Sequence, residues 1–184
     1  MKRFLFLFVF LPVFGFCQYT AIPDENFEKA LIDLGYDNVI DGQVLTSSIS
    51  SITNLDVGGE SILDLTGIED FIALNNLWCD NNQLTRLDVR KNTSLTELYC
   101  FGNKLQSLDV RKNTSLTVLY CDANKLTSLD VSKNTALERL YCYYNKLTRL
   151  DVSECAVLNN LWCDNNQLTR LDVRKNTSLT VLYC

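Results

Sequence analysis

The feature that most constrains this chain is a 21-residue unit that repeats from residue 76 to residue 180. The five successive copies begin NLWCDNNQL, ELYCFGNKL, VLYCDANKL, RLYCYYNKL and NLWCDNNQL. A repeat of this length and regularity is typical of a solenoid, in which each unit packs only against its two neighbours. The sequence therefore predicts an elongated stack of coils, without the enclosed pocket that a globular enzyme builds.

The first and last of these units are identical. Residues 76–96 and 160–180 match at all 21 positions, whereas the units between them differ from one another. Two identical copies that start 84 residues apart indicate duplication of a four-unit block. A solenoid that grows in this way tolerates a change in its number of coils.

The first 17 residues have the features of a secretory signal peptide. Lys2 and Arg3 precede an apolar stretch, residues 4–14, that is too short to span a membrane. We expect cleavage after about Cys17. Lipid anchoring at Cys17 is the alternative, which is disfavoured because Phe16 stands where lipoprotein signals have a small residue.

The segment that follows is expected to cap the stack. Residues 18–51 form this predicted N-terminal cap, with a helix over about 24–34 that ends at a glycine. Phe27, Leu31 and Leu34 are spaced so that they share one face of the helix. This face is predicted to cover the open edge of the first coil.

The coils are expected to fill the rest of the chain. Residues 52–75 form a divergent first repeat, one residue longer than the others. Residues 76–184 form the regular repeats, and the sixth of these is truncated. Because a stack that ended at Cys184 would expose its apolar core positions, we expect the chain to be a fragment with further repeats.

A leucine pattern identifies the type of repeat. The first regular copy has the pattern L-x-x-L-x-C-x-x-N-x-L, formed by Leu74, Leu77, Cys79, Asn82 and Leu84. This pattern resembles the signature of the leucine-rich-repeat family, with Cys in place of the third Leu. The Thr-Gly-Ile-Glu stretch at residues 66–69 is similar to bacterial internalin-type repeats. The resemblance implies a β-rich solenoid, a right-handed leucine-rich-repeat coil with a parallel β-sheet on one face and a short helical N-terminal cap.

The second half of each unit repeats the same pattern with valine. Leu84, Leu87, Val89 and Asn92 form this second copy in the first unit. Each coil is therefore expected to consist of two extended half-turns, each closed by an asparagine turn. We expect both sides of the coil to be β-rich, with few or no helices opposite the sheet, because these segments are short and polar.

One cysteine recurs in every unit, at Cys79, Cys100, Cys121, Cys142, Cys163 and Cys184. Export favours disulfides, and adjacent coils bring the Cα atoms within range. However, in-register side chains point in parallel, so a bridge would strain the strands. We therefore expect free, buried thiols. The absence of histidine and of any Cys-x-x-Cys pair argues against a metal site.

An outward column of aromatic residues is the main candidate for function. Because side chains alternate along a strand, Leu77 and Cys79 point inward while Trp78 points outward. Such a ladder could serve only to stiffen the sheet, but large and partly polar rings also suit recognition of a protein or a sugar. The predicted ligand-binding face consists of Trp78, Tyr99, Phe101, Tyr120, Tyr141, Tyr143, Tyr144, Trp162 and Tyr183.

Charge and composition argue against several classes of function. Residues 18–75 contain one lysine and 11 acidic residues, and in the repeats arginines alternate with an aspartate column, so we expect no nucleic-acid partner. The members of this column are Asp88, Asp109, Asp130, Asp151 and Asp172. With no histidine, no glycine-rich phosphate loop and inward cysteines, the sequence predicts no enzyme, no catalytic residue, no cofactor and no metal.

The sequence thus favours a non-catalytic binding protein that is secreted or displayed on the cell surface. The leading hypothesis is adhesin-like recognition of a protein through the aromatic sheet face. A polysaccharide is the alternative ligand, and a purely structural surface spacer is the third hypothesis. No segment of this chain is predicted to span a membrane.

Overall fold

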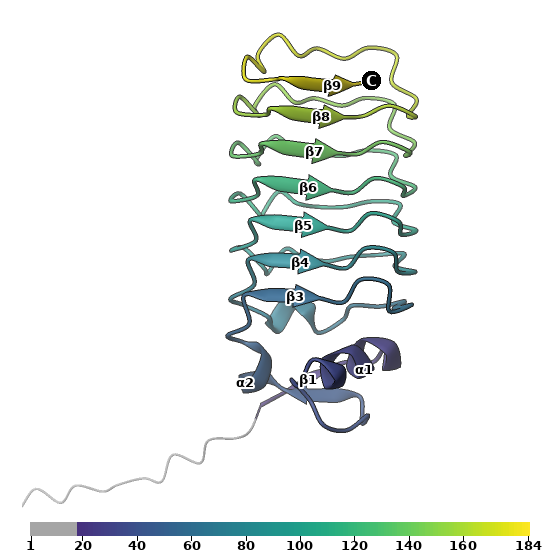
Figure 1. Cartoon of the computed structure of the whole chain (residues 1–184), viewed down its shortest axis with the longest axis vertical. Helices are drawn as coiled ribbons and strands as arrows, with labels where there is room; N and C mark the ends of the chain where they lie inside the picture. Colours follow the sequence, from purple (N-terminus) through teal and green to yellow (C-terminus); the bar gives the residue numbers. More distant parts are fainter. Residues whose placement is uncertain (1–17) are drawn as a thin grey trace, which may run out of the picture.

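The structure is a computed structural model in which residues 18–184 are described. The predicted signal peptide, with its cleavage or lipidation site at Cys17, lies outside the described residues. Figure 1 shows a stack of parallel coils with a small N-terminal cap at one end. This parallel β-solenoid with 21-residue coils confirms the predicted fold class.

The cap is built from two short strands and two helices. β1 (Tyr19–Ala21) pairs antiparallel with β2 (Gln43–Leu45), and α1 (Glu25–Asp33) lies between them in the chain. α2 (Thr46–Ile49) leads from β2 to the first coil. In Figure 1, α1 lies at the end of the stack next to β3 (Asn54–Asp56), the first strand of the coils.

The local sequence determines both ends of α1. Asp24 is the N-cap residue, and its Oδ1 accepts hydrogen bonds of 3.0 Å from the backbone N–H groups of Asn26 and Phe27. Its Oδ2 accepts two more from backbone N–H groups of the first coil, so one carboxylate joins the cap to the stack. At the other end, Gly35 has a φ of 81°, and the N–H groups of Gly35 and Tyr36 return to carbonyls of the last turn.

One expectation for α1 is wrong. The predicted buried face includes Leu34, but this residue is 43% exposed. Leu34 is the C-cap residue, immediately before the left-handed Gly35 at which the chain leaves the helix, and its side chain does not continue the buried face of Phe27 and Leu31. Ala30 and Glu28 are buried instead.

Glu28 has a structural role that the apolar pattern does not predict. Its Oε1 accepts hydrogen bonds from the backbone N–H groups of Asp41, Gly42 and Gln43, at 2.9, 2.7 and 3.0 Å. Hydrogen bonds to an ionised acceptor are stronger than neutral ones. The buried carboxylate is satisfied in this way, and it holds the loop that enters β2.

Close packing fixes the cap against the first coil. The rings of Phe27 and Phe71 stack with centroids 6.3 Å apart. Gly67 has a φ of 105°, and a Cβ atom at this position would lie 2.4 Å from the side chain of Ile22. Only glycine permits both this backbone conformation and this close approach.

Each coil contributes one short strand to a seven-stranded parallel sheet, whose spatial order follows the sequence. Leu55 of β3 pairs with Leu77 of the next strand, 22 residues later, as expected for a longer first coil. From Leu77 onward, the register advances by 21 residues per strand. After β3 the strands are β4 (Asn76–Trp78), β5 (Glu97–Tyr99), β6 (Val118–Tyr120), β7 (Arg139–Tyr141), β8 (Asn160–Trp162) and β9 (Val181–Tyr183).

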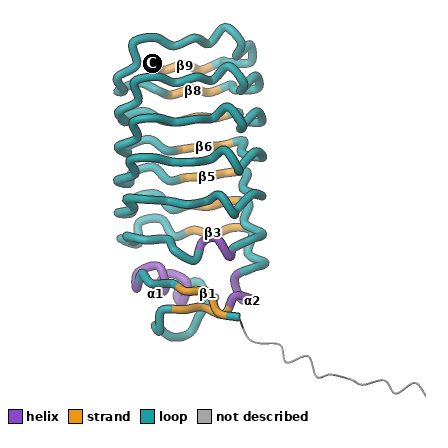
Figure 2. The backbone as a smooth tube through the Cα atoms, turned by 180° about the vertical axis from the view of Figure 1, so that it is seen from behind, coloured by secondary structure: helices purple, strands orange, loops and turns teal. Residues whose placement is uncertain are grey.

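The expectation of β-rich segments on both sides of the coil is wrong, because in residues 18–184 the side opposite the sheet has no paired strand (Figure 2). Successive coils share a backbone hydrogen bond at the start of this half-turn, such as Lys104 N to Leu84 O at 2.9 Å. Farther along the half-turn, Asp88 Oδ1 accepts a hydrogen bond from the backbone N–H of Arg90. The resulting turn bends the chain away from the extended path that strand pairing needs. A 3₁₀ turn, η1 (Ile68–Asp70), lies in the first coil.

Leucines and cysteines fill the interior as stacked columns. The cysteine column is buried from Cys79 to Cys163, while Cys184 is exposed. As predicted, every cysteine in the described part of the chain is a free thiol. Burial raises the pKa of the Cys163 thiol to about 12 and places the pKa values of Cys100 and Cys121 well above their usual range. These thiols therefore stay protonated and unreactive at neutral pH.

The first asparagine ladder closes the turn after each strand. Asn124 shows the pattern: its Nδ2 donates to the carbonyls of Cys100 and Cys121, and its Oδ1 accepts from Leu105 N at 2.9 Å. Backbone groups of two adjacent coils are thus satisfied by one side chain. The other members are Asn82, Asn103, Asn145 and Asn166.

The second asparagine ladder lies at the other turn and bonds differently. Asn113 Nδ2 donates to the carbonyls of Val89 and Asn92, at 2.9 and 2.8 Å. In one coil Cys155 takes the place of the asparagine, and its Sγ lies 3.7 and 3.6 Å from the two equivalent carbonyl oxygens. A thiol is a weak donor, so this coil is held less firmly than its neighbours.

Candidate binding face

The outward side chains of the sheet form one continuous column of rings. We call it the aromatic ladder; its members are Trp78, Tyr99, Tyr120, Tyr141, Trp162 and Tyr183. Successive ring centroids lie 5.5, 5.0, 4.1, 4.9 and 4.6 Å apart. The in-register pairing of the parallel strands places each ring directly opposite the next.

Most rings of the aromatic ladder stack on one another. Tyr120 and Tyr141 are parallel within 3°, and Trp78 and Tyr99 are parallel within 5°. Tyr99 and Tyr120 meet edge to face, at 81°. Rings packed in this way cover one another's faces and present their edges and hydroxyl groups to solvent. The aromatic ladder is therefore a surface of mixed polarity.

A second outward column, two residues beyond the aromatic ladder, alternates acidic and aromatic side chains: Asp80, Phe101, Asp122, Tyr143 and Asp164. Burial raises the pKa of the Asp122 carboxyl, and the neighbouring Tyr143 hydroxyl opposes this shift. Burial and the neighbouring Asp122 carboxylate raise the pKa of Tyr143 to about 12. On the other flank of the ladder, in β5, Glu97 lies two residues before Tyr99. Its carboxylate accepts a hydrogen bond of 2.7 Å from the Tyr99 hydroxyl. Carboxylates thus lie beside the rings in both flanks of the ladder, and Glu97 is hydrogen-bonded to one of them.

Tyr144 lies in the turn after β7 with an unusual backbone conformation. It is 59% exposed, and its φ of 48° is in the left-handed region. Its ring packs against that of Tyr143, with centroids 5.5 Å apart. A non-glycine residue in this conformation costs about 1 kcal/mol, and a bulky one is uncommon there. In other coils the same turn position, again with positive φ, is occupied by Asn81, Gly102, Ala123 and Asn165.

The two tryptophans belong to identical units but have different surroundings. Trp162 contacts the rings of Tyr141, Tyr143 and Tyr183, with centroids 4.9, 5.9 and 4.6 Å away. Its indole nitrogen is buried and has no acceptor among the described residues. Trp78, by contrast, is packed by the ring from β5. A ligand on this face would therefore reach Trp78 more easily than the indole nitrogen of Trp162.

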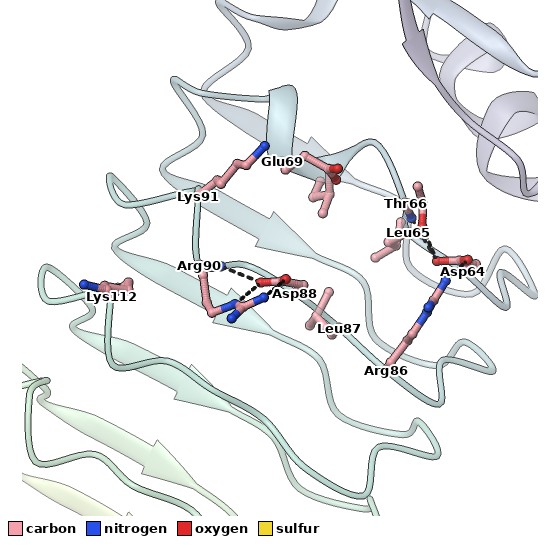
Figure 3. Close-up of a pocket in the computed structure, with 11 residues that line it drawn as sticks. Asp64, Leu65, Thr66, Glu69, Arg86, Leu87, Asp88, Arg90, Lys91 and Lys112 are labelled. Carbon is pink, nitrogen blue, oxygen red and sulfur yellow. Dashed lines mark hydrogen bonds and ion pairs between the residues drawn. The ribbon is translucent and has the colours of Figure 1, made fainter.

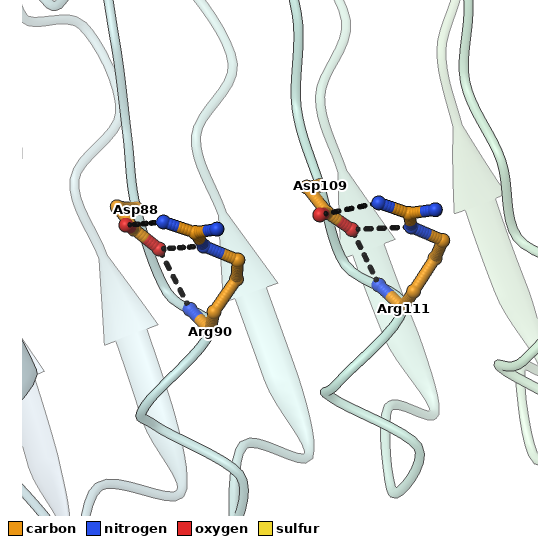
Figure 4. A network of polar contacts seen from close by, with 4 residues as sticks. All are labelled: Asp88, Arg90, Asp109 and Arg111. Carbon is orange, nitrogen blue, oxygen red and sulfur yellow. Dashed lines mark hydrogen bonds and ion pairs between the residues drawn. The ribbon is translucent and has the colours of Figure 1, made fainter.

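The side of the coils opposite the sheet contains charge pairs instead of rings. Arg90 donates to Asp88 through Nε and Nη2, at 2.8 and 2.6 Å, and Arg111 holds Asp109 in the same way at 2.9 Å (Figure 4). The hydrogen bonds from Arg111 lower the pKa of Asp109 to about 2. Arginine thus neutralises these two aspartates locally.

This neutralisation does not extend along the whole column. Asp172 is paired with Arg174, through Nη2 at 2.6 Å. Asp130 and Asp151 instead accept hydrogen bonds from the backbone N–H of the serine two residues later, both at 3.0 Å. These two coils have serine where the others have arginine, so their carboxylates stay anionic without a bidentate partner.

Comparison with known proteins identifies the repeat. Residues 93–134 match the family model for leucine-rich repeats, in two copies. A 71-residue segment is 42% identical to internalin J from Listeria monocytogenes serotype 4b (strain F2365); it makes up 39% of this chain and 8% of that protein. These are internalin-like leucine-rich repeats.

Solved structures place the internalin-like repeats in a known fold. The functional domain of internalin J from Listeria monocytogenes, which includes a cysteine ladder, aligns with a TM-score of 0.62 and 34% identity over 91% of this chain and 47% of that chain. A leucine-rich-repeat protein from Leptospira interrogans has the same fold at 24% identity, with a TM-score of 0.65 over 74% of this chain and 38% of that chain. This chain thus spans less than half the length of both solved relatives.

The internalin-like repeats place all nine residues of the predicted face on or beside the sheet. Six form the aromatic ladder, Phe101 and Tyr143 lie in the second column, and Tyr144 lies in the adjoining turn. The hydrogen bond of Glu97 with the Tyr99 hydroxyl was not predicted from the sequence; its signal is an acidic residue two positions before a tyrosine, on the same face of the strand. Residues 18–184 contain no helix that is long and apolar enough to cross a membrane.

Proposed function

We propose that this chain is a non-catalytic binding protein that recognises a protein partner, in an adhesin-like manner, through the aromatic ladder and its flanks. Internalin-like leucine-rich repeats support a protein-interaction role. The chemistry of the ladder supports its location, because rigid rings with polar edges offer contact area at low entropic cost and are enriched at binding hot spots. The flanking carboxylates fit a partner that presents basic groups.

The proposal includes export to the cell surface or the medium. Its support is the sequence of residues 1–17, with cleavage after about Cys17. Mass spectrometry of the mature N-terminus tests this point. A start at Gln18 is expected, whereas a lipid-modified Cys17 would replace release by membrane anchoring.

Tyr144 is the observation that carries the proposal. A pure spacer gains nothing from an exposed tyrosine held in a left-handed turn, where asparagine or glycine is accommodated at lower cost. Backbone strain of this kind concentrates at functional sites. The ring of Tyr144 extends the aromatic surface beyond Tyr143.

A polysaccharide is the second candidate ligand. Sugar rings pack on open aromatic faces, and Tyr144 and Tyr183 are 59% and 54% exposed. Within the aromatic ladder, however, neighbours such as Tyr120 and Tyr141 already cover each other's faces. The geometry therefore favours a protein, which can use ring edges and hydroxyl groups.

The substitution Tyr144→Asn tests the proposal, because asparagine occupies the same turn position at Asn81 and Asn165. The free energy of unfolding should rise by about 1 kcal/mol as the strain is relieved. Affinity for the partner should fall by about tenfold or more, as expected for a hot-spot ring. Immobilised protein would capture partners from extracellular fractions, and a glycan array would be probed in parallel.

Two further variants complete this test. Trp78→Ala should also weaken binding, whereas Ser128→Ala, on the opposite side of the coils, should leave it unchanged. Binding that survives both Tyr144→Asn and Trp78→Ala would contradict the aromatic face. Binding on the glycan array alone would select the polysaccharide, and no ligand in either assay would favour the structural spacer.

A further inference from the structure

Two hollows lie on the side of the coils opposite the sheet. Figure 2 shows the backbone of this side. The first hollow, of about 580 Å³, is lined by parts of residues 64–91 and by Lys112 (Figure 3). The second hollow, of about 640 Å³, is lined by parts of residues 149–175. Neither belongs to the aromatic face.

One wall of each hollow has the same sequence, because residues 76–96 and 160–180 are identical. In both walls the central aspartate holds the arginine two residues later; Arg174 donates to Asp172 through Nε and Nη2, at 3.0 and 2.6 Å. The polar residues of the wall in the first hollow are Arg86, Asp88, Arg90 and Lys91, and those in the second are Arg170, Asp172, Arg174 and Lys175.

The adjacent coil makes the two hollows different. In the first hollow, Arg86 extends toward Asp64 of the preceding coil and forms an ion pair with it (Figure 3). In the second hollow, the equivalent position below Arg170 is occupied by another cation, Arg149. Among the described residues, no carboxylate lies within 4.0 Å of the guanidinium groups of Arg149 and Arg170.

The carboxylates near the second hollow are already engaged by other donors. Asp172 holds Arg174, and Asp151 Oδ1 accepts from Ser153 N at 3.0 Å. Lys175 lies 4.0 Å from Glu154. Four basic side chains and two aspartates line this hollow, so it has an excess of positive charge.

Like charges directly opposite each other in adjacent strands or coils are destabilising. Arg149 and Arg170 belong to a column of equivalent positions in successive coils. The earlier members of this column bring no two cations together, because Asp64 lies below Arg86 and the next two coils have Ser107 and Ser128. Arg149 and Arg170 are the members of the described column at which two cations meet. A bound anion would remove their repulsion and use their free N–H donors.

We propose that the second hollow binds a tetrahedral oxyanion, a phosphate or sulfate group, between the guanidinium groups of Arg149 and Arg170. A planar guanidinium offers paired N–H donors that match two oxygens of such a group. Lys175 and the Ser153 hydroxyl lie in the lining and can contribute a charge and a further donor. The first hollow, closed by the pair of Arg86 and Asp64, does not bind it.

NMR of the ¹⁵N-labelled chain, titrated with sodium sulfate against sodium chloride at matched ionic strength, tests the proposal. Saturable shifts are expected for the Nε–H signals of Arg149 and Arg170, and none for Arg86. Arg149→Ser or Arg170→Ser should weaken the association with sulfate by about tenfold. Serine occupies this column in two other coils, so both variants should fold. Arg86→Ser is the matched control and should leave sulfate binding unchanged.

A second arm compares free sulfate, dextran sulfate and neutral dextran. If dextran sulfate binds at a lower concentration of sulfate groups than free sulfate does, the ligand is a group carried on a polymer. If the two bind at equal concentrations of sulfate groups, the ligand is the free ion. Both results support the site. The proposal is overturned if Arg86 shifts as much as Arg149, if the shifts do not saturate, or if neutral dextran produces the same shifts.

Discussion

Cys155 shows at the scale of one residue what the second asparagine ladder contributes. In the preceding coil, Asn134 Nδ2 reaches two carbonyl oxygens at 3.0 and 2.8 Å, whereas Cys155 Sγ lies 3.7 and 3.6 Å from the equivalent pair. The next asparagine, Asn176, resumes the pattern by donating to the carbonyls of Val152 and Cys155 at 2.8 Å. The ladder is thus interrupted at a single rung.

Restoring that rung should stabilise the stack. Cys155→Asn should raise the free energy of unfolding by about 1 kcal/mol, because two amide hydrogen bonds replace two weak thiol contacts. Urea denaturation measures the change. Cys142→Asn is the contrasting variant; it places an amide in the leucine core and should destabilise the protein. If the two substitutions change the free energy of unfolding equally, the carbonyl oxygens of Val131 and Asn134 do not stabilise an amide at position 155.

Asp122 gives a prediction for pH. Burial raises its pKa in the folded state, so the folded protein binds this proton more tightly than the unfolded chain. Its contribution to stability is therefore full below the unfolded pKa, about 4, and is lost as the pH rises through the folded pKa. Asp122→Asn should raise the melting temperature at pH 7 and should have little effect at pH 3. A larger effect at pH 3 than at pH 7 would reverse the sign and contradict this account.

The membership of the aromatic face could be predicted from the sequence, but its geometry could not. Alternation along each strand and the 21-residue period place the rings of the aromatic ladder on one surface. Whether Tyr99 and Tyr120 stack or meet edge to face depends on side-chain torsions set by neighbours in three coils. The left-handed conformation of Tyr144 is equally hidden, because its turn position is recognised only from the asparagine and glycine in other coils.

At the scale of elements, some features of the cap could be predicted from local sequence, while others depend on residues farther along the chain. Asp24 and Gly35 mark the ends of α1 in the sequence, since each satisfies a requirement local to the helix terminus. The burial of Glu28 depends instead on a loop that follows 13 to 15 residues later in the chain, at residues 41–43. The unpaired second half-turns were mispredicted for a related reason, because the aspartate turns that bend them look like strand in an alternating pattern.

The hydrogen bonds of Glu28 define a prediction for the cap. Glu28→Ala should lower the free energy of unfolding by about 3 kcal/mol, since three buried backbone N–H groups would lose their charged acceptor. Hydrogen exchange at residues 41–43 should accelerate in the same variant. Glu25→Ala, on the exposed side of α1, is the control and should change neither quantity. Unaltered exchange in Glu28→Ala would mean that the loop is held by other contacts.

At the scale of the whole molecule, the cysteine column reports on the integrity of the stack. Its buried members, from Cys79 to Cys163, have at most 1% of their surface exposed, so we expect thiol reagents to reach them mainly when adjacent coils separate. The charge is also unevenly divided, since the cap and first coil are strongly acidic while the regular coils contain most of the basic residues. The molecule therefore has an acidic end and a core that resists thiol reagents.

Thiol labelling checks this description. Iodoacetamide at pH 8 should modify Cys184 rapidly and leave Cys79, Cys100, Cys121 and Cys142 unmodified until the chain is unfolded, because burial keeps these thiols protonated and inaccessible. Peptide mapping identifies the labelled sites. A reducing agent should leave the melting temperature unchanged. Rapid labelling of Cys121 in the native protein, or a melting temperature that falls on reduction, would contradict free buried thiols.

The uniform 21-residue register also determines how the molecule would respond to a mechanical load. Successive regular coils are joined by the same short strands and by the uninterrupted first asparagine ladder. A pull along the chain from one end would therefore detach coils singly, in a series of similar force peaks. Each peak would release one coil of 21 residues, which adds about 70 Å of extended chain. Such a protein would lengthen stepwise under tension while its remaining coils kept the aromatic ladder intact.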